Sequence, residues 1–147
     1  MKGIVCGVCG FISLDGIPEI CPICMSPKEK FSEVENAYHM PDFKAETGES
    51  EKKHIPKITL IEQCGLMGDG FMGVHAKIGE IAHPMLPEHH ITSIYFYLDN
   101  KYAGSVFLSA PSAAPGAMLN LKSAKGKISV IEHCNIHGSW YNEIEIK

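Results

Sequence analysis

Short apolar runs separated by turn residues occupy the chain from residue 57 onward. Hydrophobic and polar positions alternate along 128–132 (Ile-Ser-Val-Ile-Glu) and along 144–146 (Ile-Glu-Ile), which is the period of a strand with one buried face. Runs of this kind predict seven strands, at residues 57–63, 73–79, 90–98, 102–109, 116–121, 127–133 and 139–146. The pattern contains no convincing helix.

Turn residues separate the expected strands. The segment 99–101 (Asp-Asn-Lys) joins two of them as a hairpin does, and the glycine-rich segment 65–70 marks a longer loop. Seven short strands without helices predict a mainly β fold, an immunoglobulin-like seven-stranded β-sandwich.

The first part of the chain follows a different pattern. It is rich in cysteine, glycine and proline and too short to bury an apolar core, so it needs a metal to fold. A polar, acidic stretch without periodicity then indicates a linker. We expect a small metal domain at 1–37, a linker at 38–52 and a β-sandwich at 53–147. His39, in this linker, is expected to be solvated rather than to bind a metal.

The composition excludes several classes of function. Hydrophobic residues make up 45% and charged residues 20% of the 147 residues, as in a globular protein. No apolar run is long enough to span a bilayer, and the first residues lack the apolar core of a signal peptide. We therefore expect a cytoplasmic protein with no membrane partner. The net charge of -4 gives no attraction to nucleic acid, and none is expected as a partner.

Four cysteines form two Cys-x-x-Cys pairs near the N-terminus. Cys6 and Cys9 are followed, after eleven residues, by Cys21 and Cys24, and such pairs can hold one ion in a tetrahedral thiolate site. A disulfide is less favoured, because an intracellular chain keeps its thiols reduced. The site accepts iron or zinc, and zinc would make it purely structural. Cys64, in an apolar stretch, is expected to be a small buried hydrophobe.

Five further donors lie in three separated segments of the β region. They are His54, His83, His89, Cys134 and His137. Four imidazoles and a thiolate are too many for zinc, which normally takes four ligands, whereas five donors leave one octahedral position open. Mixed nitrogen and sulfur ligation with an open position suits a redox metal, iron first and copper second.

Neighbouring residues are expected to orient these donors. Pro56 should keep the chain at His54 extended, and the backbone amides of Asn135 and Ile136 should donate hydrogen bonds to the sulfur of Cys134.

The remaining histidines of the β region are expected not to bind the metal. They are His75, His90 and His133. His90 points away from its neighbour in a strand, and His133 is close enough to Cys134 to influence the site without binding the metal.

Residues 6–31, with both cysteine pairs, resemble the short rubredoxin-like domain of rubrerythrins. The shared features are Cys-Gly-Val-Cys-Gly-Phe at 6–11, Cys-Pro-Ile-Cys at 21–24 and Pro-Lys-Glu-Lys-Phe at 27–31. The resemblance implies a single iron bound by the four cysteines and one-electron transfer.

The chain from Lys53 to its end resembles the superoxide reductase family of desulfoferrodoxin and neelaredoxin. The shared motifs are Lys-His-Ile-Pro at 53–56, His-Pro-Met at 83–85 with Glu-His at 88–89, and Cys-Asn-Ile-His-Gly at 134–138. The resemblance implies iron bound in a plane by the four histidines, Cys134 on the axis and superoxide at the opposite position. It also implies that Lys53 attracts superoxide, as a positive charge near an anionic substrate would.

One position departs from the family pattern. Many members carry glutamate directly before the lysine that matches Lys53, whereas here Lys52 stands there and Glu51 is displaced by one residue. We therefore do not count Glu51 among the ligands.

The expected function is the one-electron reduction of superoxide to hydrogen peroxide, with the four-cysteine site relaying electrons from an external donor such as a rubredoxin-like protein. The resemblance further implies a homodimer or homotetramer. One alternative is an electron carrier like the blue copper proteins, but these use two histidines and one cysteine, commonly with an axial methionine. Another is an interaction module in which both metals only hold structure.

Overall fold

The computed structural model describes residues 1–41, 49–62, 66–122 and 125–146. The N-terminal part, here called the knuckle (residues 1–37), is a small antiparallel sheet in the order β2-β1-β3. Its elements are β1 (Gly3–Cys6), β2 (Ile12–Ser13), the 3₁₀ helix η1 (Lys28–Lys30) and β3 (Phe31–Val34). Cys6 is the last residue of β1 and Cys9 lies in the turn that follows, whereas Cys21 and Cys24 lie in the connection between β2 and η1.

The rest of the chain forms two packed antiparallel sheets, and all seven predicted strands are present. One sheet has the order β10-β9-β6-β7 and the other β4-β5-β8. Their bounds are β4 (Pro56–Ile61), β5 (Met72–Ile78), β6 (Ile91–Leu98), β7 (Lys101–Phe107), β8 (Gly116–Leu121), β9 (Gly126–Cys134) and β10 (Gly138–Ile146). The mainly β sandwich is therefore confirmed. Asp99 and Asn100 both have positive φ, as the tight turn of a hairpin requires.

The sequence pattern predicted no helix, and this prediction was wrong. Residues 49–54 form the short helix α1 (Glu49–His54), and His54 is its last residue rather than part of an extended segment. Tertiary hydrogen bonds hold this turn: the Lys52 carbonyl accepts from the amides of Glu80 (2.7 Å) and Ile81 (3.3 Å). A helix fixed by such bonds needs no apolar periodicity, which is why the sequence did not reveal it.

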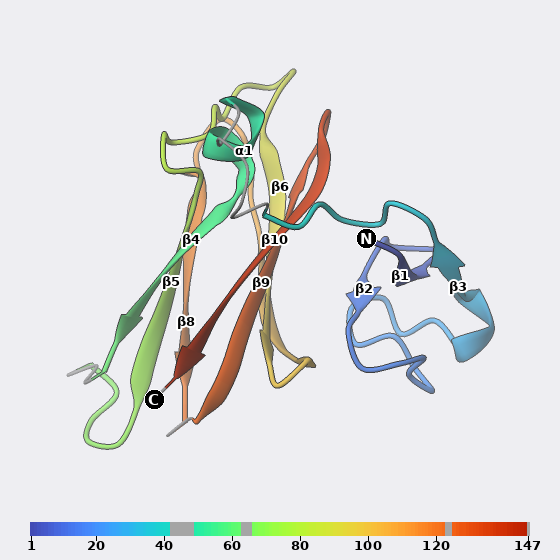
Figure 1. Ribbon diagram of the computed structural model, residues 1–147, viewed down its shortest axis with the longest axis horizontal. Helices are drawn as coiled ribbons and strands as arrows, with labels where there is room; N and C mark the ends of the chain where they lie inside the picture. Colours follow the sequence, from blue (N-terminus) through green and yellow to red (C-terminus); the bar gives the residue numbers. More distant parts are fainter. Residues whose placement is uncertain (42–48, 63–65, 123–124, 147) are drawn as a thin grey trace.

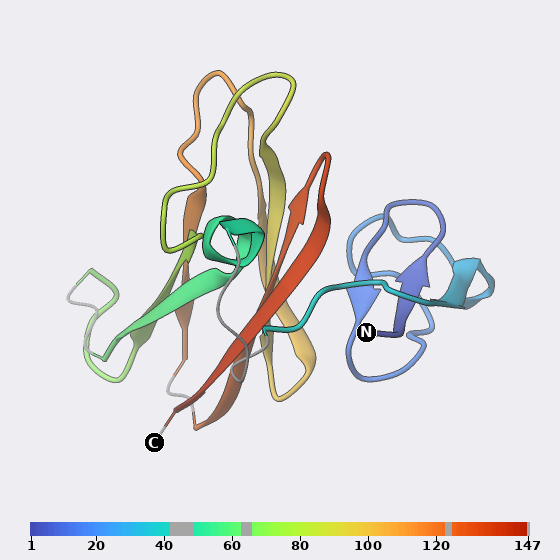
Figure 2. The ribbon, with the colours of Figure 1, turned by 45° about the horizontal axis from the view of Figure 1, so that its top comes forward.

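The knuckle packs on the outer face of the four-stranded sheet, beside β6, β9 and β10 (Figure 1, Figure 2). One buried cluster joins the two parts, with Phe11 and Ile12 of the knuckle against Tyr95 and Tyr97 of β6 and Ile131 of β9. A second cluster fills the space between the two sheets. The molecule therefore has two cores, one on each face of the four-stranded sheet.

The connection after the knuckle continues this packing along the edge strand β10. The His39 amide donates to the Ser139 carbonyl (2.8 Å), and the Tyr141 amide donates to the His39 carbonyl (2.9 Å). Tyr38 is buried, and its ring lies 5.5 Å from that of Tyr141. This pairing covers part of an edge that would otherwise expose unpaired backbone groups.

Among the described residues, no helix is long and apolar enough to cross a membrane.

Candidate metal centres

The four cysteines of the knuckle converge as the sequence predicts. Cys6 Sγ lies 3.7 Å from Cys24 Sγ, and Cys9 Sγ lies 3.6 Å from Cys21 Sγ, and no disulfide joins them. An ion about 2.3 Å from each sulfur in a tetrahedron places the sulfurs about 3.8 Å apart. The geometry therefore fits one tetrahedral thiolate-bound ion.

Cys9 and Cys24, the second thiols of the two pairs, have different surroundings. Hydrogen bonds from the Ser26 hydroxyl and amide lower the pKa of Cys24 to about 6, and its sulfur lies 3.1 Å from Ser26 Oγ. Burial instead raises the pKa of Cys9, which faces the sandwich. A bound cation would favour the thiolate form at both positions.

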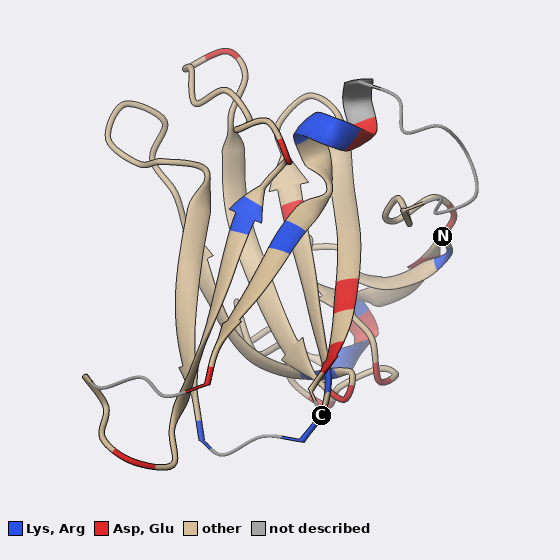
Figure 3. Cartoon of the chain, turned by 60° about the vertical axis from the view of Figure 1, so that its left-hand side comes forward, with Lys and Arg blue, Asp and Glu red and all other residues tan. Residues whose placement is uncertain are grey.

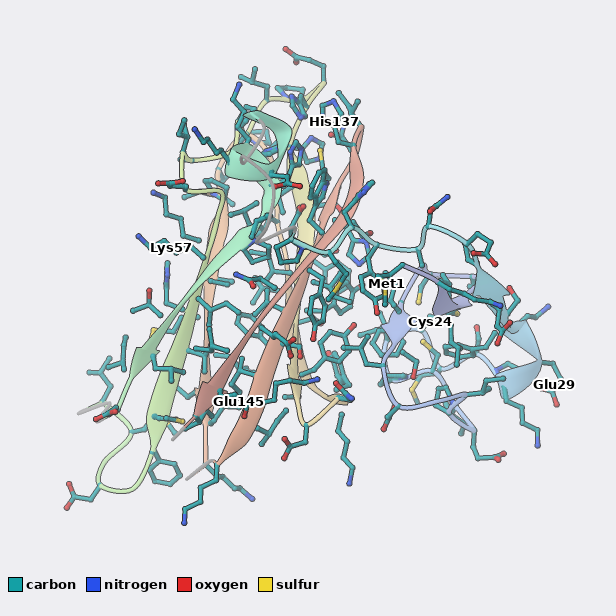
Figure 4. All side chains as sticks on the ribbon, in the orientation of Figure 1. Met1, Cys24, Glu29, Lys57, His137 and Glu145 are labelled. Carbon is teal, nitrogen blue, oxygen red and sulfur yellow. The ribbon has the colours of Figure 1, made fainter. Side chains whose placement is uncertain are left out.

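The four predicted histidines form a near-square at one end of the sandwich. Successive ring centroids in the order His54, His83, His89, His137 and back to His54 are 4.7, 4.6, 4.8 and 5.0 Å apart. The diagonal from His54 to His89 is 6.3 Å, which is close to the ratio of a diagonal to a side in a square. Figure 4 shows His137 at this end, beside α1.

Nitrogen atoms face the centre of the square. His54 Nε2 is 3.2 Å from His83 Nε2, and His89 Nε2 is 3.2 Å from His137 Nδ1. Neighbouring nitrogens about 2.1 Å from one ion in a square plane lie about 3.0 Å apart. The spacing therefore fits a single metal ion bound by three Nε2 atoms and one Nδ1 atom.

Cys134 supplies a sulfur next to this square from inside the sandwich. Its Sγ is 3.5 Å from His83 Nε2 and 3.8 Å from His137 Nδ1. The donor atoms of His54, His89, Cys134 and His137 all lie within 4.8 Å of one another, and His83 adjoins this group through its two short contacts. Cys134 and His54 are buried, whereas His137 is exposed and His89 half-buried. Solvent therefore reaches the square from the side of His89 and His137.

The Cys134 sulfur is held by the turn between β9 and β10. The His137 amide donates to Sγ at 3.4 Å, and hydrogen bonds from the His137 and Ile136 amides partly offset the effect of burial, which raises the pKa of Cys134. The prediction for Ile136 is thus confirmed. The prediction for Asn135 is wrong, because its amide donates to the His90 carbonyl at 3.1 Å.

Asn135 instead ties the loop at 83–89 to the end of β9. Its side-chain amide donates to the Glu88 carbonyl (3.1 Å), and its side-chain oxygen accepts from the His90 amide (2.9 Å). Within the loop, the amides and carbonyls of Leu86 and His89 bond to each other at 2.9 and 3.0 Å. These bonds fix the position of His89 relative to Cys134.

His83 has a defined tautomer. Its Nδ1 lies 2.7 Å from the Pro84 carbonyl, and since a carbonyl only accepts, Nδ1 carries the proton and Nε2 presents a lone pair to the site. Burial lowers the pKa of His83 to about 4. The ring is therefore neutral and ready to bind a metal near neutral pH.

Helix α1 brings Lys53 to the square together with His54. Burial lowers the pKa of His89, and the positive charges of His137 and then Lys53 add to this effect. The turn at Gly79 makes the close approach of α1 possible. Gly79 has φ +84°, and a Cβ there would lie 2.6 Å from the Lys53 carbonyl oxygen and collide with that of Ile81. Figure 3 shows lysine on α1 at this end of the sandwich.

Trp140 was not anticipated from the sequence. Its indole stacks on the His54 ring at 4.8 Å and 20° and on the His39 ring at 4.3 Å and 28°. Its Nε1 donates to the His137 carbonyl at 3.1 Å. His39 is exposed as expected, but it also contributes to this stack. A lone tryptophan in an apolar strand pattern usually indicates core packing, so no sequence signal distinguished this one.

The other histidines take different hydrogen bonds. His90 Nδ1 lies 3.0 Å from the Leu86 carbonyl, and His133 Nδ1 bonds to the Ser139 hydroxyl at 2.5 Å. Burial lowers the pKa of His133 to about 4. Neither these two nor His75 belongs to either group of possible metal ligands found among the described residues.

Glu51 lies away from the histidine square. Glu51 lines a surface cavity with Ile55 and Asn142, and none of the predicted metal ligands lines it. The prediction that Cys64 is buried lies outside the described residues.

The comparisons with known proteins cover both parts of the chain. The family model for desulfoferrodoxin matches residues 46–143, and that for the rubredoxin-like domain of rubrerythrin matches residues 5–32.

Individual relatives align with the sandwich. A superoxide reductase of Pyrococcus horikoshii is 35% identical over 107 residues, which cover 65% of this chain and 89% of that protein. A desulfoferrodoxin of Desulfarculus baarsii is 37% identical over 94 residues, covering 64% of each. Among solved structures, the superoxide reductase (neelaredoxin) of Ignicoccus hospitalis has a TM-score of 0.60 at 29% identity and covers 76% of this chain and 95% of its own.

Proposed function

Because the chain belongs to the desulfoferrodoxin family, whose model covers more than half of it, we propose that it is a superoxide reductase. Its substrate is superoxide, its product is hydrogen peroxide, and its cofactor is one iron ion held by His54, His83, His89, His137 and Cys134. The observation that carries the proposal is the near-square of four imidazoles with a sulfur beside it.

Reduction of superoxide to hydrogen peroxide consumes one electron and two protons. Iron bound at this site supplies the electron. The residues of the chain keep the site in a competent state: His83 is held as a neutral donor by the Pro84 carbonyl, and the amides of Ile136 and His137 stabilise the thiolate of Cys134. The exposed position of His137 leaves the site open to solvent, which supplies the protons.

Lys53 is proposed to attract the anionic substrate. It precedes the ligand His54 on α1, and its charge already lowers the pKa of His89. A cation at the entrance increases the local concentration of superoxide on a protein whose net charge is -4.

The four-cysteine site of the knuckle is proposed to bind iron and to relay electrons. Its sulfur spacing accepts iron or zinc alike, and the choice of iron rests on the match to the rubredoxin-like domain of rubrerythrin. A separate one-electron donor, such as a rubredoxin-like protein, would reduce the knuckle. Assembly as a homodimer or homotetramer remains part of this proposal.

A blue copper carrier is a poorer explanation of the geometry. Such a site uses two histidines and a cysteine, whereas here four imidazoles surround one point and three of their contacts with neighbouring donors are 3.5 Å or shorter.

Product analysis tests the proposed activity. Iron-loaded protein supplied with a one-electron donor should consume superoxide and form hydrogen peroxide without releasing dioxygen. Equal yields of dioxygen and peroxide would instead identify a dismutase, and no faster loss of superoxide than in buffer would identify a carrier. The metal-free protein is the control.

A further inference from the structure

A cavity of about 240 Å³ lies between the knuckle and the outer face of the four-stranded sheet. The knuckle contributes Cys9 and Gly10 to its wall, and the sheet contributes Thr92, Ser93, Tyr95, Phe107 and His133. Cys9, a predicted ligand of the knuckle metal, thus lines the same cavity as His133, and His133 directly precedes Cys134 in the chain.

Aromatic rings connect these two walls. The Tyr95 ring lies 5.8 Å from Phe11 of the knuckle, and it lies 5.0 Å from the His133 ring at an angle of 85°. Cys21 belongs to the same buried cluster as Tyr95, and Cys9 packs against that cluster. Side-chain packing therefore links the cysteines to the cluster that contains Tyr95, and Tyr95 to His133, along the wall of the cavity.

Strand β9 connects the two faces of the sheet through His133 and Cys134. Successive side chains of a strand point to opposite faces, so His133 faces the knuckle while Cys134 lies in the core between the two sheets and reaches the histidine square. One peptide unit separates them. The backbone of β9 is thus the shortest covalent link between the two faces at this point.

The docking of the knuckle is fixed by specific contacts. The Tyr97 hydroxyl donates to the Ile12 carbonyl at 2.6 Å in a buried position, and Phe11 stacks on Tyr97 at 6.2 Å. The Ser139 hydroxyl holds the His133 ring. These contacts keep the two walls of the cavity at a constant separation.

Resting on the proposed function, we propose that electrons pass within one chain from the knuckle metal to the catalytic metal through Cys9, Tyr95, His133 and Cys134. In each transfer the ferrous knuckle iron loses one electron and becomes ferric, and the ferric catalytic iron gains it and becomes ferrous. No bond is formed or broken. The external one-electron donor then reduces the knuckle again.

The route is tested in the full-length protein with iron at both centres. A photochemically generated reductant reduces the knuckle, and absorbance then follows the return of its ferric band together with the loss of the ferric band of the catalytic centre. The transfer should follow first-order kinetics with a rate constant that does not depend on protein concentration. An observed rate constant that rises in proportion to protein concentration would show transfer between molecules and overturn the proposal.

Two leucine variants separate the route from the rest of the interface. Tyr95→Leu removes the ring between Cys9 and His133 and should slow the internal transfer severalfold. Tyr102→Leu is the matched control, because the Tyr102 ring also contacts Phe11, at 5.5 Å, but does not line the cavity. Its transfer rate should equal that of the wild type. An unchanged rate in Tyr95→Leu, or equal slowing in both variants, would overturn the route.

Reduction potentials and hydrogen exchange show whether Tyr95→Leu removes the route alone or also displaces the knuckle. The reduction potentials of both centres should stay unchanged in Tyr95→Leu, and hydrogen exchange of the Ile12 region in the zinc-loaded protein should match the wild type. If Tyr95→Leu does not fold, His133→Leu replaces it with the same expected slowing, and an unchanged rate there counts against the route.

The reaction of pre-reduced wild-type protein with superoxide tests the proposed function separately. If this reaction is absent, the proposed function fails. If this reaction is present but the rate of internal electron transfer is the same in the variants as in the wild type, only the proposed route fails.

Discussion

Trp140 connects three parts of the site through a single side chain. It stacks on the proposed ligand His54 and on His39, and it donates a hydrogen bond to the His137 carbonyl. Stacking of this kind contributes about 0.5–1.5 kcal/mol beyond burial. The indole therefore fixes the plane of the His54 ring before a metal binds.

Replacing Trp140 should weaken metal binding at the histidine site. Trp140→Leu removes the stack, and we expect the affinity for iron(II) or zinc at this site to fall about 2- to 10-fold, measured by competition with a chelator. Trp140→Phe keeps a stacking ring and should lose less. Equal affinity in all three proteins would show that the indole does not orient His54.

Lys53 should act on substrate capture and not on metal binding. Lys53→Ala is expected to lower the second-order rate with superoxide, and the difference from wild type should shrink as salt is added, because screening weakens long-range attraction. Lys57→Ala, at an exposed position of β4, is the control and should change the rate less. If both variants behave alike at low ionic strength, Lys53 has no special role.

Buried histidines should make the metal-free protein sensitive to acid. Burial lowers the pKa of His83 and of His133 from 6.5 to about 4, so below pH 6.5 the unfolded chain binds protons that the folded chain does not. The free energy of unfolding should therefore fall between pH 6.5 and 4 and level off below this range. Denaturant titrations of wild type and His83→Gln test this. A variant with the same pH slope as the wild type would contradict the contribution of His83.

At the scale of elements, the β-sandwich was predictable and its attachments were not. Alternation and turn residues gave all seven strands close to their observed positions, because one buried face per strand leaves a periodic pattern. Helix α1 depends on hydrogen bonds that the backbone amides of the turn after β5 donate to the Lys52 carbonyl. Such bonds join distant segments through backbone atoms, so no side-chain pattern records them.

Gly79 should be needed for the position of α1. Its positive φ alone makes Gly79→Ala cost about 1–2 kcal/mol, and the collision with the Lys53 carbonyl should add to this and slow superoxide capture. Gly70→Ala is the matched control, since Gly70 has φ +83° and nothing within 4 Å of a built Cβ. We expect the control to lose unfolding free energy, measured with denaturant, without losing rate. Equal effects in both variants would show that Gly79 does not hold α1 in place.

At the scale of the whole molecule, one sheet separates two metal centres and touches both. The two groups of donor side chains that the fold brings together could be proposed from the sequence, because spacing and donor type within each segment are local features. The docking of the knuckle on Tyr95 and Tyr97 was not, because aromatic residues in a strand pattern do not reveal which face a second domain covers. Because of this docking, Cys9 and His133 line the same cavity, and the proposed electron route starts from that arrangement.

A single turnover shows whether the histidine square with Cys134 reduces superoxide. Protein with ferrous iron at this site is mixed rapidly with superoxide, and absorbance and peroxide are followed together. We expect one hydrogen peroxide for each catalytic iron, formed as a thiolate-to-ferric-iron absorption band appears, and no such band in Cys134→Ser. Superoxide loss while the iron stays ferrous, or the same band in Cys134→Ser, would show that this site does not reduce superoxide with Cys134 bound to the iron.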